Sequence, residues 1–318
     1  MTFLSESDFL NFINRYFPLI HPNILLERGD DCNLISSKGN LCISSDLFLE
    51  ESHFSRQYFS AGDIGYKALA VNISDISAMG ARPQGFLLNL MIPEDLGSDF
   101  WANFFDGMSQ LANHFDLALA GGDISRARFL GIDITIWGNI NNRCLERKRC
   151  RSGDVLFVIG QLGLARTGRK MLETGNDLFG SLEAIKAHLR PRLFVEQAVS
   201  LSDFSGVTGL MDVSDGLVRD LPRFLGPELG ADLLIREDNI HPEVVKYATS
   251  QGCCPVEFAL HGGEDYCLLG CADKGVMSEL KAYFPEFMYL GQVLPTPGLK
   301  LSGVTYQSDG FDHFSNMI

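Results

Sequence analysis

The sequence predicts a mixed α/β or α+β protein that is built from two domains. Two observations support this expectation. The chain has 318 residues, which is enough for two domains of ordinary size with substantial cores. Short apolar runs typical of strands also alternate with segments whose apolar residues recur at helical spacing. Hydrophobic residues make up 46% and charged residues 21% of the chain, as in soluble globular proteins.

The first half of the chain is expected to contain both helices and strands. Ser5 and Asp8 resemble a capping box, and apolar residues follow them at helical spacing. A second helix should end before Gly80 and Pro83, which are stop signals. The expected elements are, in order, a helix from about residue 8, a strand over 41–45, a helix over 63–79, a strand over 84–92, a helix over 100–115, and strands over 117–120 and 130–140.

The segment 141–154 is polar and basic, and it is the best candidate for a domain boundary. We therefore expect an N-terminal domain over 1–145 and a C-terminal domain over 146–318. The expected elements of the second domain are a strand over 155–159, helices near 163–174 and 193–201, a strand over 207–213, a helix from about residue 216, a helix near 241–251, a strand near 265–271, a helix near 274–284 and a strand near 287–294.

The acidic balance of the chain limits its partners. The formal net charge is −14, so nucleic acids and anionic membranes are not expected to bind. No run of apolar residues is long enough for a transmembrane helix, and the N-terminus lacks the pattern of a signal peptide. The eight cysteines form no CxxC pair, which favours reduced thiols and a cytoplasmic protein. An acidic protein that binds phosphates would need cations to do so.

Acidic residues recur beside glycine or serine, and several of these clusters follow an apolar run. The clusters are Gly29-Asp30-Asp31, Ser44-Ser45-Asp46, Ser74-Asp75, Gly121-Gly122-Asp123, Asp212-Val213-Ser214-Asp215-Gly216 and Gly262-Gly263-Glu264-Asp265. Carboxylates and hydroxyls are ligands that Mg²⁺ prefers, and glycines let the backbone approach phosphates. Each cluster alone is equally typical of a turn or a helix cap. Six such clusters in one chain favour a shared site for metal and phosphate.

Standard nucleotide-binding and hydrolytic motifs are missing from the sequence. Residues 163–170 have the glycine spacing of a Walker A motif without its Lys-Ser/Thr ending, so we interpret them as part of a helix. The sequence contains no GxGxxG, no protein-kinase motif set, no HExxH and no Gly-x-Ser-x-Gly. Nothing indicates a nucleophilic triad.

Seven segments together resemble the thiamine-monophosphate kinase family. They are GDDC (29–32), SSDLFLEESHF (44–54), GYKALAVNISDISAMGARP (65–83), GGDIS (121–125), DVSDG (212–216), GGEDYCLL (262–269) and GFDHF (310–314). The wider group includes aminoimidazole ribonucleotide synthetase and selenophosphate synthetase. The pair His53-Phe54 and the ending GFDHF are marks of the kinase family itself.

The resemblance implies a homodimer in which the N-terminal sheet pairs with its twin, and a C-terminal α/β domain that closes over the site. It also implies direct transfer of the γ-phosphoryl group of ATP, the co-substrate, to thiamine monophosphate, with several Mg²⁺ ions. No catalytic residue beyond the metal ligands is expected, because a phosphate acceptor with a pKa of about 6 is already a nucleophilic anion.

The resemblance assigns residues to three roles by matching motifs. The implied metal ligands are Asp30, Ser44, Ser45, Asp46, Asp75, Asp123, Asp212 and Asp215. The implied ATP contacts are Phe105, Gly122, Asp123, Arg147 and Ser214. The implied substrate contacts are His53, Glu264 and Phe311.

The sequence departs from the family pattern at three of these places. Phe105 stands where a tyrosine is usual, the run RKRCRSGD leaves Arg149 and Arg151 as alternatives to Arg147, and GGDIS ends in Ile-Ser. Structural roles also remain open: His53 as a packed histidine, Phe105 as a core residue, Arg147 as a solvated loop charge and Phe311 as a hairpin aromatic. The alternative functions are another ATP-using synthetase of the wider group and a catalytically silent ATP-binding relative.

Overall fold

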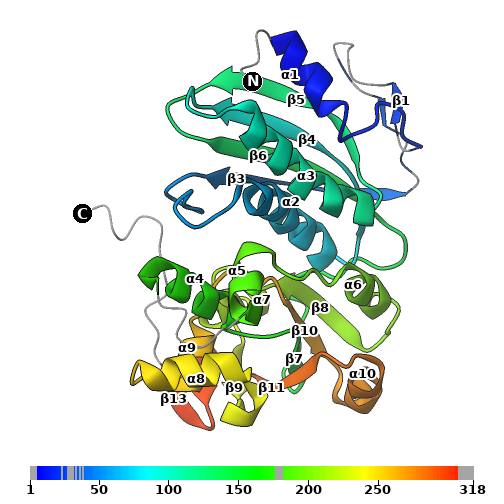
Figure 1. Ribbon diagram of the computed structural model, residues 1–318. Helices are drawn as coiled ribbons and strands as arrows, with labels where there is room; N and C mark the ends of the chain where they lie inside the picture. Colours follow the sequence, from blue (N-terminus) through cyan, green and yellow to red (C-terminus); the bar gives the residue numbers. More distant parts are fainter. Residues whose placement is uncertain are drawn as a thin grey trace. The chain divides into compact units, whose positions relative to one another are not determined.

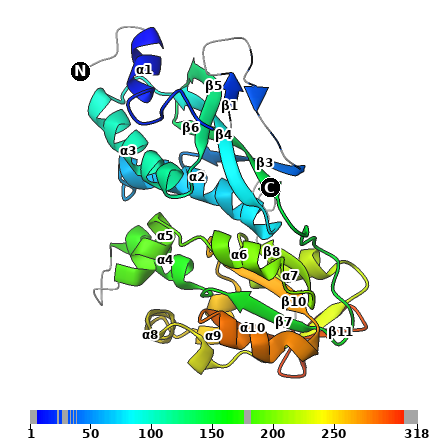
Figure 2. The same cartoon turned by 90° about the vertical axis from the view of Figure 1, so that its right-hand side faces the viewer.

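The structure is a computed structural model that describes residues 6–22, 24–26, 32, 34–35, 37, 39–175 and 182–306. The chain divides into two compact units, which are shown in Figure 1 and, turned by 90°, in Figure 2. Unit 1 comprises Met1–Ser77 and Ala81–Asn141, and unit 2 comprises Ala78–Gly80 and Asn142–Ile318. The polar segment 141–154, in which a boundary was expected, contains the passage from unit 1 to unit 2.

The described residues of unit 1 form a four-stranded mixed sheet in the order β3-β6-β4-β5. Its strands are β3 (Asn40–Leu49), β4 (Arg82–Ile92), β5 (Ala118–Arg126) and β6 (Gly131–Ile140). The pair β4–β5 is parallel, and the pairs β3–β6 and β4–β6 are antiparallel. The other elements of unit 1 are α1 (Glu6–Ile13), α2 (Ala61–Ala78), α3 (Ser98–His114) and the small sheet of β1 (Ile24–Leu26) and β2 (Leu34–Ile35).

Helices α2 and α3 cover one face of the four-stranded sheet (Figures 1 and 2). The side chain of Ser60 caps α2, because it accepts the N–H of Asp63 at 3.2 Å and donates to its carboxylate at 2.6 Å. The two helices approach closely at Gly65, where an added Cβ would lie 2.0 Å from the carbonyl oxygen of Phe104. The alternating residues Phe86, Leu88 and Leu90 of β4 are buried. They form the core of unit 1 between sheet and helices.

The opposite face of this sheet is partly open. Ile43 and Leu47 of β3 are 67% and 53% exposed. Farther along the sheet, side chains of β4 and β5 together with Leu10 and Ile13 of α1 line a cavity of about 840 Å³. Successive side chains of a strand point to opposite sides, so β3 buries Phe48 on the helix side of the sheet and exposes Ile43 and Leu47 on the other.

The described residues of unit 2 form a seven-stranded sheet in the order β13-β12-β9-β11-β7-β10-β8. Its strands are β7 (Val155–Ile159), β8 (Val207–Asp212), β9 (Gly230–Leu233), β10 (Leu268–Ala272), β11 (Phe287–Leu294), β12 (Gly298–Leu301) and β13 (Val304–Tyr306). The pair β12–β9 is parallel and the other pairs are antiparallel. All five residues of β7 are buried, so this strand lies at the centre of the core.

Helices alternate with the strands of unit 2 along the chain. They are α4 (Leu164–Thr174), α5 (Leu182–Leu189), α6 (Val195–Leu201), α7 (Leu217–Leu225), α8 (Pro242–Ser250), α9 (Pro255–Leu260) and α10 (Met277–Tyr283), with short 3₁₀ turns η1 (Glu237–Asn239) and η2 (Lys274–Val276). Residues 163–170 belong to α4 and its N-cap, as the missing Walker A ending suggested. No helix in the described part of the chain has both the length and the apolarity needed to cross a bilayer.

The expected fold class is confirmed, and one expectation about the cysteines is wrong. Cys150, before β7, and Cys271 of β10 form a disulfide, with their Cα atoms 5.9 Å apart. Sequence spacing cannot reveal this pair, because the two residues are 121 positions apart and are brought together by the pairing of β7 with β10. The thiol of Cys267 is free and buried, and burial raises its pKa well above the ordinary value.

Candidate functional site

In unit 1, the structure brings together three of the implied metal ligands. Ser44 and Asp46 lie on β3 and Asp75 lies on α2. The hydroxyl of Ser44 donates to Oδ2 of Asp75 at 2.5 Å. Burial, then the charge of Asp75 and a hydrogen bond with Asp75, together raise the pKa of Asp46 to about 6. This is an oxygen-rich group in which two carboxyls face each other.

The structure places Ser45 on the other face of the sheet. Its hydroxyl lies 3.1 Å from Oγ1 of Thr135 and donates to Oδ1 of Asp133 at 3.2 Å. Asp133 in turn accepts from the side chain of Asn89 at 2.8 Å. Ser44 and Ser45 are therefore not equivalent, because only Ser44 contacts Asp75.

Asp123 of β5 belongs to the same face as Ser45. It is the register partner of Asn89, it is exposed, and it lines the cavity described above together with Gly122. Gly122 has a φ of +149°, and an added Cβ would lie 1.7 Å from the carbonyl oxygen of Leu88. Only glycine fits this position beside β4, and Gly122 is exposed where it lines the cavity.

His53 and Phe105 both make contacts within the protein. The ring nitrogen Nδ1 of His53 accepts the N–H of Leu49 at 3.0 Å, so a neutral ring carries its proton on Nε2. The ring of Phe105 is fully buried and packs against Phe9, Trp101 and other aromatic residues. It presents no face to solvent in this structure.

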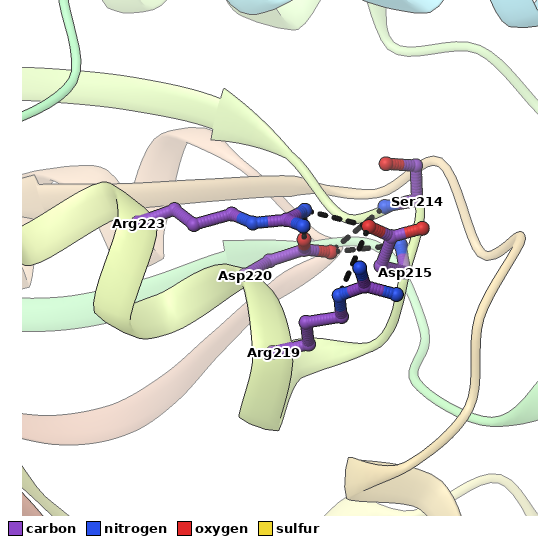
Figure 3. A network of polar contacts seen from close by, with 5 residues as sticks. All are labelled: Ser214, Asp215, Arg219, Asp220 and Arg223. Atoms are coloured by element: carbon purple, nitrogen blue, oxygen red, sulfur yellow. Dashed lines mark hydrogen bonds and ion pairs between the residues drawn. The ribbon is translucent and has the colours of Figure 1, made fainter. Parts of the chain in front are cut away.

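In unit 2, the DVSDG segment follows β8 directly. Asp212 is the last residue of β8 and is buried. Asp215 is held by two arginines of α7: Nη1 of Arg223 lies 2.6 Å and Nε of Arg219 lies 3.5 Å from its Oδ2 (Figure 3). The hydrogen bond to Asp215 raises the pKa of Arg223 above its ordinary value. The carboxylate is therefore already charge-compensated.

Asp220 fixes the backbone of this segment, and the motif did not reveal it. Its Oδ2 accepts the N–H groups of Ser214 at 3.1 Å and Asp215 at 2.9 Å, and its Oδ1 lies 3.3 Å from Nη1 of Arg223 (Figure 3). Burial raises its pKa to about 6, against the effect of these donors. The amide of Ser214 therefore donates within the protein.

The GGEDY segment combines a candidate ligand with a structural acid. Glu264 has a φ of +66°, and its N–H donates to the carbonyl of Ser214 at 2.7 Å. Its Oε2 lies 3.1 Å from Nδ1 of the buried His188 of α5. The next residue, Asp265, caps α4 by accepting the N–H groups of Gly163 and Ala165. Burial raises the pKa of Asp265 to about 8, although these amides oppose the shift.

The remaining implied residues lie in loops or outside the described part. Arg147, Arg149 and Arg151 are all exposed, and Arg149 pairs with Glu146 at 2.8 Å, which leaves Arg147 and Arg151 without this pairing. Asp30 and Phe311 lie outside the described residues.

The donor sets fit Mg²⁺ that is shared with phosphates, rather than a metal site built by protein alone. Within the described residues, no three His, Cys, Asp or Glu side chains gather closely enough to hold an ion. Ser44, Asp46 and Asp75 supply hard oxygens side by side, as Mg²⁺ requires, and Mg²⁺ typically takes its other ligands from water and substrate phosphates.

Comparisons with known proteins agree with these motifs. Residues 29–140 match the family model of AIR synthase related protein, N-terminal domain. The thiamine-monophosphate kinase of Aquifex aeolicus is 31% identical over 90% of this chain and 92% of its own length. That of Rhodopirellula baltica is 33% identical over 87% of this chain and 86% of its own.

A solved structure gives the same answer for the fold. AaThiL complexed with AMPPCP and TMP has a TM-score of 0.78 and 28% identity, over 98% of this chain and 97% of that chain. The motifs, the fold and the identity to curated relatives over most of the chain agree, and this chain therefore belongs to the thiamine-monophosphate kinase family.

Proposed function

We propose that this protein transfers the γ-phosphoryl group of ATP to thiamine monophosphate, which gives thiamine diphosphate and ADP. The observation that supports this most strongly is the identity of 31% to a thiamine-monophosphate kinase over 90% of the chain. The related AaThiL binds AMPPCP and TMP, an ATP analogue and the acceptor that the proposal requires.

The chemical task is to bring two polyanions together. Two unit charges 4 Å apart repel by about 4 kcal/mol at an effective dielectric constant of 20. The acceptor phosphate is largely dianionic at neutral pH, since its second pKa is about 6, so it needs no general base. The protein must therefore position both phosphates and compensate charge, which is the main demand of phosphoryl transfer.

We assign roles to the described residues as follows. Ser44, Asp46 and Asp75 of unit 1 would hold Mg²⁺, and Asp212 and Asp215 of unit 2 would hold Mg²⁺ as well. When bound, Mg²⁺ would supply the positive charge that lets phosphates approach these carboxylates. Asp123 would hold Mg²⁺ that is shared with the nucleotide phosphates, beside the exposed backbone of Gly122.

Other proposed roles concern the two substrates. The hydroxyl of Ser214 and the guanidinium of Arg147 would contact ATP, with Arg149 and Arg151 as the alternative donors. His53 would contact thiamine monophosphate through Nε2, because its Nδ1 is occupied by Leu49. Glu264 would contact it through a carboxylate that His188 orients. Ser45, Phe105, Asp30 and Phe311 keep the roles that the resemblance implies as predictions.

We also propose that the protein is a cytoplasmic homodimer. Ile43 and Leu47 expose apolar surface on the open face of the unit 1 sheet, which a second copy would cover. Light scattering should give twice the mass of the chain, and Ile43→Asp should reduce it to that of one chain. A count of thiols in the denatured, unreduced protein tests the disulfide: six titratable thiols are expected, and eight would contradict it.

One assay tests the proposed reaction. The protein is incubated with Mg·ATP and either thiamine monophosphate or thiamine, and thiamine diphosphate is measured by chromatography. Product from the monophosphate alone supports the proposal. Lack of product with either acceptor would contradict it, and ATP hydrolysis without product would favour a synthetase of the wider group. Nucleotide binding without turnover would favour a silent relative.

A further inference from the structure

Two arginines hold the Asp215 carboxylate, and nothing in the family motif calls for them. Arg223 contacts Oδ2 of Asp215 at 2.6 Å, and Arg219 approaches the same oxygen at 3.5 Å (Figure 3). Both arginines project from α7, which begins two residues after Asp215. The arrangement is therefore fixed within a single short segment of unit 2.

The backbone of this segment is held more firmly than the arginines. Asp220 is fully buried, and its carboxylate accepts the N–H groups of both Ser214 and Asp215. In contrast, the side chain of Arg223 is 44% exposed and that of Arg219 is 19% exposed. If the contact to Asp215 opens, the backbone that carries Asp215 stays in place.

Two acids and two bases meet in this group. The negative charges of Asp215 and Asp220 are matched by the guanidinium groups of Arg219 and Arg223. A divalent cation that approaches Asp215 must therefore displace a guanidinium or bind beside it, and both weaken the binding of the free cation. A displaced guanidinium is well suited to phosphate, since its planar N–H groups match two phosphate oxygens.

We propose that Arg219 and Arg223 form a guanidinium latch on Asp215, which disfavours free Mg²⁺ at this carboxylate and transfers to a phosphate oxygen when metal arrives together with the nucleotide. The latch rests on the proposed function, because it assumes that Asp215 is a metal ligand. It makes the Asp215 site respond to the metal–nucleotide complex rather than to free Mg²⁺.

The test measures binding of Mn²⁺, as a probe for Mg²⁺, by paramagnetic resonance without nucleotide. Arg223→Gln should bind Mn²⁺ about three- to fivefold more tightly than the unaltered protein, because an exposed ion pair no longer competes. Arg223→Lys keeps the charge and should stay close to the unaltered protein. Arg236→Gln, which removes another exposed arginine from its pair with Asp238, should have no effect.

The second measurement adds AMPPCP with Mg²⁺ and follows binding by calorimetry. Arg223→Gln should weaken binding of this complex about three- to tenfold, since a phosphate contact is lost. The same substitution in the Asp215→Asn background should no longer change Mn²⁺ affinity. A merely structural arginine would lower thermal stability without making Mn²⁺ bind more tightly.

The outcomes separate this inference from the proposed function. Unchanged or weaker Mn²⁺ binding by Arg223→Gln overturns the latch, as does a tightening that persists in the Asp215→Asn background. Unchanged AMPPCP binding also overturns it. If Asp215→Asn leaves binding of Mn²⁺ together with AMPPCP intact, the metal-ligand role of Asp215 fails first. If Asp215→Asn weakens that binding and Arg223→Gln has no effect on either measurement, only the latch fails.

Discussion

Asp75 of unit 1 and Asp215 of unit 2 come from similar Ser-Asp motifs, but their surroundings differ. Asp75 receives a hydroxyl from Ser44 and faces the carboxyl of Asp46, whose pKa is raised to about 6. Asp215 is held by Arg219 and Arg223. Asp75 thus lies beside a second acid, whereas the negative charge of Asp215 is compensated by two arginines.

The difference shows two ways in which a protein prepares a carboxylate for a cation. Two facing carboxyls repel each other until a cation arrives, so their affinity for it is high. A carboxylate in an ion pair must first exchange its partner, so its affinity is lower. We therefore expect substitutions in unit 1 to affect Mg²⁺-dependent activity more than those in unit 2.

The largest effect is expected from Asp75→Asn. The substitution removes the charge that both Asp46 and Ser44 contact, so kcat/KM should fall by about 10³-fold while the fold is retained. Steady-state kinetics with ATP and thiamine monophosphate measure the change. Asp63→Asn, in the first turn of the same helix, is the matched control and should keep near-normal activity.

Asp215→Asn should have the next largest effect, a loss of about 10²-fold in kcat/KM. The loss is smaller because Arg219 and Arg223 compensate the charge of this carboxylate. Titration of activity with Mg²⁺ for both variants measures the difference. Near-normal activity in both would contradict the role of these acids in metal binding, and a larger loss for Asp215 would reverse the comparison.

Asp220→Asn should mainly destabilise unit 2. An amide cannot accept from two backbone N–H groups and also face Arg223 without placing donor against donor, so we expect a loss of about 2–3 kcal/mol. Urea denaturation measures the free energy of unfolding. Asp238→Asn, on an exposed acid, is the control and should leave the midpoint unchanged. Equal midpoints for both variants would show that Asp220 does not hold this loop.

The smallest effect separates the two neighbouring serines of β3. Ser44→Ala removes the hydroxyl that contacts Asp75 and should raise the Mg²⁺ concentration for half-maximal activity about three- to tenfold. Ser45→Ala should change it less, because the hydroxyl of Ser45 contacts Asp133 and Thr135 on the other face. A larger effect from Ser45 would place the metal on that face instead.

The sequence predicted the place of most strands and helices, but not all of their lengths. The strands expected over 41–45 and 117–120 run over Asn40–Leu49 and Ala118–Arg126, and helix α5 was not predicted. The strands β7 and β11 match the expected ranges 155–159 and 287–294, because they are buried apolar runs with polar ends. The strands β9, β12 and β13 were not predicted. They have three or four residues each, and their pairing with one another and with β11 comes from contacts far apart in the sequence.

The candidate site could be predicted only as a set of motifs. Spacing suggested that acids follow strands. The resemblance assigned both Ser44 and Ser45 to the metal, although adjacent residues of a strand point to opposite faces. It also missed Asp220 and His188, because their importance depends on burial and on partners that local sequence does not reveal. The arginines of α7 were missed for a further reason, since charged residues on a helix are usually solvated.

The position of Asp220 also changes how relatives of this protein should be recognised. Its carboxylate, and not a bound anion, satisfies the amides of the DVSDG loop, so the functional unit extends from Asp212 to Asp220. A useful search pattern is therefore D-x-S-D-G-x-x-x-D. The residues at positions 219 and 223 then divide the sequences that match it into those with and those without the two arginines. Sequences that keep the pattern and lack both arginines should bind divalent cations before nucleotide, and those that resemble this chain should bind them together.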